Sequence, residues 1–263
     1  MRLLIIGPGR AGGAMAIASQ RAGHDIGGVL TRDHDEARWP VLPWDEPLPE
    51  ADIALIAVRD EAIPEVSARI APYVARVGVV AHMSGFVPVM TLHGLRGAGT
   101  AIGGFHPLQT FPDAETGASA LTGSYVGIDG DELAVDMLTH LATSLEMEPF
   151  RLDDAARPAY HAAAAAAANF VVTALGVSAD LFDSAGIDPK VSRPLVERAV
   201  ANVYDRGAKG SLTGPIARGD VETVVGHLTA AREVSEHVGR QFRLMAEATT
   251  IRAGREEDLR QWK

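Results

Sequence analysis

The stretch Met1-Arg-Leu-Leu-Ile-Ile-Gly-Pro-Gly-Arg-Ala-Gly12 decides the fold of this chain. Its first half is mostly apolar and predicts a buried strand. The residues that follow it, Gly13-Ala-Met-Ala-Ile-Ala18, predict a helix. The turn between them has the glycine spacing G-x-G-x-x-G, so strand, tight turn and helix N-terminus follow one another directly.

Each glycine of this turn has a physical task. Gly7 makes the turn, Gly9 lets the backbone approach a pyrophosphate, and Gly12 lets the helix pack against the strand. Unpaired N–H groups and the positive end of the helix dipole would then hold phosphates. The turn predicts a dinucleotide site with contacts from Gly7, Pro8, Gly9, Arg10, Ala11 and Gly12. An ordinary βα turn is the alternative.

The end of the second predicted strand, residues 24–30, indicates which dinucleotide binds. An NAD site usually has an acidic residue about 20 residues past the glycines, where it binds the ribose 2′-hydroxyl. Here the strand ends in Thr31-Arg32-Asp33. Arg32 is a fixed cation suited to a 2′-phosphate, and Thr31 adds a hydroxyl donor, so NADP is favoured over NAD. In the alternative, Asp33 binds the ribose and Arg32 is solvated.

Composition limits the classes of protein that fit. The chain has 263 residues, 47% of them hydrophobic, and a mean hydropathy of +0.06, so a sizeable core can form. There is no cysteine, which excludes disulfides and thiolate metal sites, and we predict no metal. A net charge of −10 disfavours nucleic acid and anionic membranes as partners. The alanine-rich stretch near residue 165 is too weakly hydrophobic to predict a membrane span, and with no signal peptide we expect a cytoplasmic protein.

The two halves of the chain have different patterns. Strands alternate with helices in the first half, which predicts a doubly wound parallel sheet of the Rossmann-like α/β class. The further strands are predicted at residues 51–58, 77–82, 100–105, 125–128 and 149–152. Helices are predicted over about 59–74 and at 132–145. The second half predicts only helices, at residues 157–184, 193–205 and from Asp220 into the 240s, with a loop over 207–219. We therefore predict a nucleotide-binding domain over 1–152 and an all-α domain over 153–263.

Polar residues follow three of the predicted strands, at the edge of the sheet where ligands bind. Ala57, Val58 and Arg59 end the third strand, where cofactor riboses usually pass. Ser84 follows the fourth and could position a substrate oxygen. His106 ends the fifth and precedes a proline; because an imidazole titrates near neutrality, it is a candidate for acid–base work. Loop histidines satisfied by backbone carbonyls are the alternative.

Two clusters in the helical half could carry chemistry. At 100° per residue, His161 and Asn169 share one helix face, with Arg157 one turn earlier and Tyr160 beside them. The alternative is a helix whose small residues serve packing. The segment Leu212-Thr-Gly-Pro-Ile-Ala-Arg-Gly-Asp220, which contains Arg218, fits either an anion clamp or a turn in which Asp220 caps the next helix.

Together these motifs resemble a known family. They are G-x-G-x-x-G, T-R-D, H-x-S-G, F-H-P-L-x-T-F, Y-H-x-A-x(5)-N and L-T-G-P-x-A-R-G-D. The chain resembles a bacterial family with a Rossmann-like N-domain and a C-terminal domain of unknown function, within the 6-phosphogluconate dehydrogenase C-terminal-like proteins. Relatives include pyrroline-5-carboxylate reductase, ketopantoate reductase and prephenate dehydrogenase. The resemblance implies NADP binding, a helical domain that forms a homodimer, and a site in the interdomain cleft.

The chain departs from its relatives in one important respect. β-Hydroxyacid dehydrogenases and ketopantoate reductases place a catalytic lysine on the helix that opens the second domain, and this helix has none. Arginine stays protonated, so the proton role falls to a histidine. We predict an NADP-dependent oxidoreductase acting on a small oxo, hydroxy or imino acid. Its predicted catalytic residues are His161, His106, Asn169 and Ser84, and its predicted substrate-binding residues are Arg157, Tyr160 and Arg218. The alternative is a sensor or scaffold that binds NADP without turnover.

Overall fold

The computed structural model describes residues 1–32 and 38–262 and divides into two compact units, Met1–Ala165 and Ala166–Lys263. The first unit contains every strand of the described chain. The division falls inside the long helical stretch that begins at Arg157, whereas the sequence analysis places the domain boundary before that helix.

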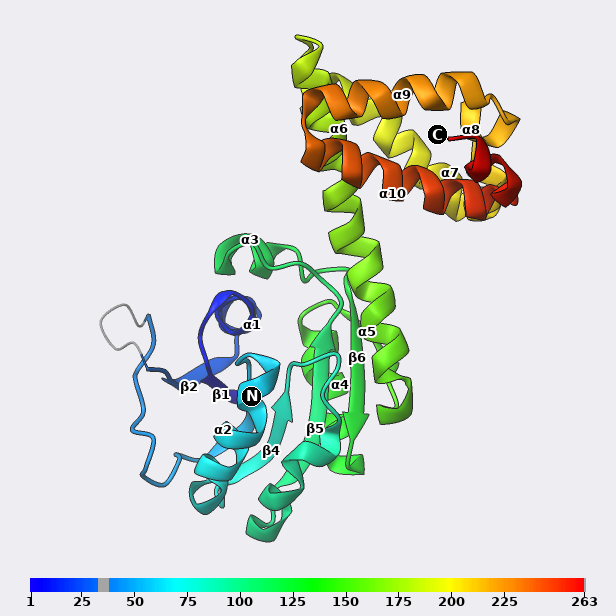
Figure 1. Cartoon of the computed structure of the whole chain (residues 1–263). Coiled ribbons are helices and arrows are strands. Elements are labelled where there is room, and N and C mark those ends of the chain that lie inside the picture. The colour runs from blue at the N-terminus through cyan, green and yellow to red at the C-terminus, as the bar shows by residue number, and fades with distance from the viewer. Residues whose placement is uncertain (33–37, 263) are drawn as a thin grey trace. The chain divides into compact units, whose positions relative to one another are not determined.

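The first unit is built on one seven-stranded sheet (Figure 1). In chain order its strands are β1 (Arg2–Ile6), β2 (Asp25–Leu30), β3 (Ala51–Ile56), β4 (Val77–His82), β5 (Ala101–Pro107), β6 (Tyr125–Gly130) and β7 (Glu148–Arg151). They lie in the order β2-β1-β3-β4-β5-β6-β7. All neighbours pair in parallel except β5 and β6, which are antiparallel. The Rossmann-like class is thus confirmed, with one antiparallel step in the sheet.

Helices cover both faces of this sheet because its buried strands alternate between two apolar cores. Leu3 and Ile5 of β1 face one core with α1 (Arg10–Arg21), α3 (Ala114–Ser119) and α4 (Glu132–Ser144). Leu4 and Ile6 face the other, with α2 (Ile63–Ile70) and the 3₁₀ segment η3 (Val89–Ala98). Shorter 3₁₀ segments are η1 (Asp60–Ala62), η2 (Ala71–Tyr73) and η4 (Asp154–Ala156), and α5 (Arg157–Ala165) ends the unit.

The antiparallel step determines where α5 begins. Because β6 and β7 run against β5, β7 ends on the side of the sheet where the parallel strands start. Helix α5 then runs back toward the carboxyl ends of those strands: Arg157 lies near Gly104, and Tyr160, one turn later, contacts His106 at the end of β5. The fold thus brings α5 to the edge of the sheet where ligands bind in such proteins.

The second unit is helical throughout its described part. It comprises the π-turn η5 (Ala166–Phe170), α6 (Val171–Ser184), η6 (Pro189–Ser192), α7 (Arg193–Ser211), α8 (Pro215–Arg218), α9 (Val221–Val234), α10 (Glu236–Ala253) and η7 (Glu256–Gln261). The predicted loop over 207–219 is wrong, because α7 continues past a kink at Gly207 and α8 fills part of the rest. Asp220 caps α9 as predicted, but the predicted last helix ends at Val234.

One stretch, Asp154–Ser184, is long and apolar enough to cross a membrane by length and composition, with a hydropathy of 1.7. Only 6% of its apolar window is buried. Such a stretch is weak evidence for a membrane span.

Candidate active site

The glycine-rich turn has the geometry that a dinucleotide requires. Gly7 has a φ of +89°, which strongly favours glycine. A Cβ on Gly12 would meet the carbonyl oxygen of Gly7 and lie 2.8 Å from Ala57 Cβ, so helix and strand pack as closely as predicted. Nothing lies within 4 Å of a Cβ on Gly9, which is the N-cap of α1 and gives it no side-chain cap. The start of α1 is therefore open, as a phosphate-binding turn must be.

A hollow of about 650 Å³ lies at the carboxyl ends of β1, β2 and β3. Its lining includes eight of the predicted cofactor residues: Gly7, Pro8, Gly9, Thr31, Arg32, Ala57, Val58 and Arg59. The other three, Arg10, Ala11 and Gly12, belong to the first turn of α1 and do not line it. Asp33, the alternative ribose ligand, lies outside the described residues.

The far wall of this hollow contains residues that the sequence analysis missed. Trp44 donates from Nε1 to the carbonyl oxygen of Thr31 at 3.0 Å. The guanidinium of Arg69 lies 4.8 Å from the centre of the Trp44 ring and pairs with both oxygens of Asp45, at 3.1 and 2.9 Å. Asp45 offsets the charge of Arg69, and Arg59 lies 3.2 Å from Glu61. Arg32 is therefore the arginine of this lining for which no carboxylate partner is found among the described residues, and it fits an anionic nucleotide. The sequence signal that could have identified this wall was Trp44, a tryptophan in a segment between two strands.

A second group of side chains meets where β4, β5 and α5 approach one another. His106 Nδ1 lies 2.7 Å from the Tyr160 hydroxyl, and the rings of His106 and His161 are 6.0 Å apart between centroids. A Cβ on Gly85 would lie 2.8 Å from His106 Nε2 and 2.9 Å from His161 Nδ1. Glycine at this position therefore lets both rings pack against the loop that follows β4, where His161 Nδ1 is buried. The structure brings together three of the predicted residues, His106, Tyr160 and His161.

Burial changes the protonation of this group. Desolvation, followed by the nearby charges of His161 and Arg157, lowers the pKa of His106 to about 4. Desolvation raises the pKa of Tyr160 to about 12. Both side chains are therefore uncharged near pH 7.

Ser84 and Arg157 both form hydrogen bonds within the loop that follows β4. The Ser84 hydroxyl accepts from the backbone N–H groups of Phe86 and Val87, at 3.0 and 2.9 Å. Arg157 is fully buried; it donates to Asp154 Oδ1 at 2.7 Å and to the Ser84 carbonyl oxygen at 3.0 Å. The predicted role of Arg157 in substrate binding needs an accessible guanidinium, so this geometry gives it a different role, holding the loop that carries Ser84 and Gly85.

The remaining predicted residues belong to the second unit. Asn169 is exposed within the π-turn, and the spacing that placed it on the face of His161 assumed an uninterrupted α-helix. Arg218 is exposed at the end of α8, beside a capped turn in which Asp220 accepts from Thr223. Of the two interpretations of this segment, the capped turn is the one observed.

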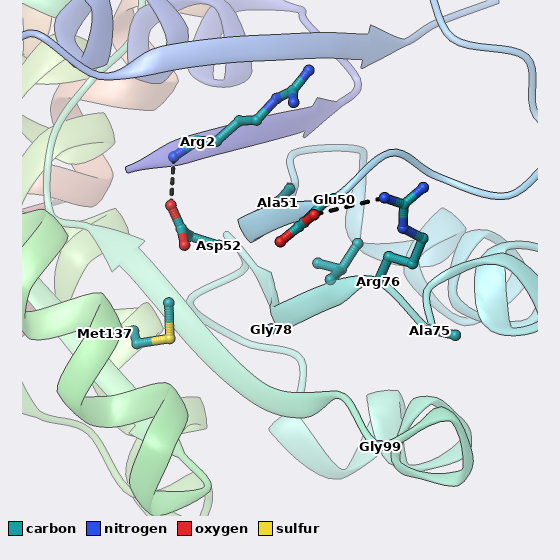
Figure 2. A pocket seen from close by; sticks show the side chains of 10 residues that line it. Arg2, Glu50, Ala51, Asp52, Ala75, Arg76, Gly78, Gly99 and Met137 are labelled. Atoms are coloured by element: carbon teal, nitrogen blue, oxygen red, sulfur yellow. Dashed lines mark hydrogen bonds and ion pairs between the residues drawn. The ribbon is translucent and has the colours of Figure 1, made fainter.

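Another hollow, of about 810 Å³, lies at the opposite ends of the strands. Figure 2 shows its charged residues in pairs: Asp52 accepts from the backbone N–H of Arg2 at 2.6 Å, and Arg76 lies 3.6 Å from Glu50. Ligands of doubly wound sheets bind at the carboxyl ends, so we place the site at the first hollow. Within the described residues, no group of three or more His, Cys, Asp or Glu side chains could hold a metal ion.

The fold and the open turn define a Rossmann-like domain, and a helical region follows it. Residues 1–107 match the Rossmann-like domain family, and residues 124–249 match the domain of unknown function DUF2520. These two matches confirm the resemblance found in the sequence, a Rossmann-like N-terminal part followed by a C-terminal part similar to a domain of unknown function.

Several solved structures share this fold. A Bacteroides fragilis protein, provisionally named an NADP oxidoreductase, matches 95% of this chain and 97% of its own length, with 22% identity and a TM-score of 0.81. Plasmodium falciparum pyrroline carboxylate reductase with NADP bound matches 94% and 98%, with 14% identity and a TM-score of 0.64. An imine reductase from Myxococcus stipitatus in complex with NADP⁺ matches 95% and 92%, with 14% identity and a TM-score of 0.66. No curated protein sequence matches the chain.

Proposed function

We propose that the protein is an NADP-dependent oxidoreductase that transfers hydride between the nicotinamide and a small carbonyl or imino compound. The observation that carries this proposal is the uncapped start of α1, open above Gly9, beside a hollow lined by Arg32. The shared fold of NADP-dependent reductases supports it. When bound, the cofactor supplies the hydride chemistry, and this chain supplies orientation and a proton.

The acid–base residue that we propose is His161. Its Nδ1 is buried and accepts or donates no hydrogen bond within the part of the chain that the structure describes. It lies beside His106, and both imidazole rings pack against Gly85. Asn169 remains our proposal for orienting the substrate. The sequence analysis expected an oxo, hydroxy or imino acid, but the buried Arg157 offers no carboxylate site, so the substrate class proposed here does not require an acid.

Titration calorimetry with NADPH and NADH tests the cofactor assignment. Replacing Arg32 with Ala should weaken NADPH by roughly tenfold or more, the loss expected for a charged hydrogen bond, and leave NADH almost unchanged. Arg76→Ala, at the opposite end of the sheet, is the matched control and should change neither. Equal losses for both cofactors in Arg32→Ala would overturn the choice of NADP.

Turnover separates the enzyme from the alternative, an NADP-binding sensor or scaffold. NADPH oxidation should be followed by absorbance across a panel of carbonyl and imino compounds. Tight NADPH binding with no consumption in any of them would favour the sensor.

We also propose a homodimer formed through the helical unit. Large apolar side chains are exposed on it, among them Val172 and Leu195, each 70% exposed, and Tyr204 at 86%. An apolar hollow of about 570 Å³, lined in part by Phe182 and Phe242, lies in the same unit. Leaving such a surface in water is unfavourable, and a second copy would cover it. Light scattering should give twice the chain mass of 27.7 kDa; a monomer at micromolar concentration would count against this proposal.

The remaining proposals concern location and partners. We propose a cytoplasmic protein whose partner is a small-molecule substrate. The net charge of −10 disfavours nucleic acid and an anionic membrane surface as partners.

A further inference from the structure

The hydrogen bond between His106 and Tyr160 determines which nitrogen of His106 carries a proton. The Tyr160 hydroxyl and His106 Nδ1 are 2.7 Å apart, and the rings meet edge to face with centroids 5.4 Å apart. Either the tyrosine O–H donates to Nδ1, or Nδ1–H donates to the tyrosine oxygen.

The surroundings favour the tyrosine as donor. If Nδ1–H were the donor, the hydroxyl proton of the half-buried Tyr160 would have no acceptor within the described chain, and an O–H without a partner is costly. Within the described chain His106 is the one hydrogen-bond partner of this hydroxyl. The low pKa of His106 and the high pKa of Tyr160 agree with a neutral acceptor and a protonated donor.

A neutral imidazole that accepts at Nδ1 must carry its proton on Nε2. Cε1 and Nε2 of His106 would both lie 2.8 Å from a Cβ on Gly85, and His161 Nδ1 would lie 2.9 Å from the same Cβ. The described structure provides no acceptor for Nε2. A side chain at position 85 would clash with both rings. Nε2 of His106 is not among the buried atoms without a hydrogen-bond partner in the described chain, so a ligand atom can reach it.

We propose that Tyr160 is a positioning residue that fixes His106 as the Nε2–H tautomer, and that His106 is a neutral hydrogen-bond donor to the carbonyl oxygen or imine nitrogen of the substrate. This inference rests on the proposed oxidoreductase function. It changes the role of His106 from a possible acid or base to an electrophile that polarises the substrate double bond. Such a donor acts without gaining or losing a proton, so proton transfer is left to His161.

The tautomer can be measured without a substrate. In ¹⁵N-labelled protein at pH 7, two-bond ¹H–¹⁵N correlation spectra should show His106 with an unprotonated Nδ1 and a protonated Nε2. The signals are assigned by their loss in His106→Gln. Tyr160→Phe removes the donor and should convert His106 to a mixture of tautomers. Tyr125→Phe, at an exposed tyrosine of β6, is the matched control and should change nothing. An Nδ1–H tautomer in the wild type, or unchanged His106 signals in Tyr160→Phe, would overturn the proposal.

A pair of substitutions tests the role of the Nε2–H group in turnover. The amide nitrogen of a glutamine can replace Nε2 as a donor but cannot act as a base, whereas leucine does neither. With a compound that the wild type reduces, His106→Gln should retain activity within about tenfold, and His106→Leu should lose about 10²–10³-fold in kcat, the range for one such donor. NADPH affinity should stay unchanged in both. Equal losses would overturn the donor role. If no compound is reduced, the proposed function fails while the spectra still decide the tautomer.

Discussion

Arg157 should be one of the most costly side chains of the first unit to remove, although it is charged. Its guanidinium is fully buried and donates to Asp154 and to the Ser84 carbonyl oxygen. Methionine has a similar length and no charge, so Arg157→Met removes both hydrogen bonds while filling much of the space. The variant therefore isolates the polar contribution of the side chain.

The expected loss follows from these two contacts. Hydrogen bonds to charged groups contribute about 1.5–3 kcal/mol each, and a buried carbonyl left unpaired costs about 1–3 kcal/mol. Asp154 is 30% exposed and still accepts from the Val89 N–H at 2.8 Å, so the loss of its hydrogen bond with Arg157 should cost an amount at the lower end of this range. Removing a buried charge also recovers some desolvation energy. We expect a net loss of about 3 kcal/mol, equivalent to roughly 6–12 °C in Tm for a unit of this size.

Thermal and urea unfolding measure this loss, with Arg151→Met as the matched control. Arg151 also pairs with an aspartate, Asp129 at 3.2 Å, but its side chain is 57% exposed. An exposed pair contributes about 0–1 kcal/mol, so the control should unfold almost as the wild type does. If Arg157→Met and Arg151→Met lose the same small amount, the argument that the buried guanidinium holds the β4 loop is wrong.

Three further predictions, which use four substitutions, have defined outcomes. Gly9→Ala should leave the thermal midpoint unchanged, because its Cβ enters open space, yet weaken NADPH and NADH alike in calorimetry. Gly12→Ala should lower the thermal midpoint, because its Cβ meets the Gly7 carbonyl oxygen. The reverse pattern would contradict the proposed turn geometry. His161→Ala should reduce kcat by about 10²–10⁴-fold at constant NADPH affinity, and normal turnover would exclude it as the acid–base residue. Burial lowers the pKa of both His82 and His106 from 6.5 to about 4. As the pH falls from 6.5 toward 4, these histidines therefore bind protons in the unfolded chain before they do so in the folded chain, and the free energy of unfolding should decrease. The loss should reach about 3 kcal/mol for each histidine. His82→Asn should flatten this dependence in urea unfolding, and an unchanged slope would contradict the assignment.

The sheet could be predicted from the sequence because its signals are local. Each strand is a short apolar run between polar or glycine-rich segments, and the first turn carries its glycines at a fixed spacing. The break between α9 and α10 was missed for a related reason. It occurs at Ser235, whose hydroxyl accepts from the Val238 N–H at 3.1 Å, and neither glycine nor proline marks it.

The candidate site could be predicted only in part, because its contacts join distant segments. Nothing local distinguishes the buried Arg157 from an exposed arginine; its burial depends on Ser84, 73 residues earlier, and on the absence of a side chain at Gly104. Likewise, the stacking of Arg69 on Trp44 brings together a loop and the last turn of a helix. The sequence identified His106, Tyr160 and His161 as candidates, but their pairing required the fold.

The antiparallel step between β5 and β6 has a consequence for the order in which the protein folds. The hollow of about 650 Å³ is lined by described residues between Gly7 and Arg69, so it needs the elements from β1 to α2 and none of the later strands. Tyr160 reaches His106 only after β6 and β7 have joined the sheet in reverse, and that contact closes a loop of 54 residues. Each further segment that must be ordered costs conformational entropy, so a contact that needs more of the chain in place forms later. During refolding we therefore expect the chain to regain nucleotide affinity before it regains the ordered histidine pair.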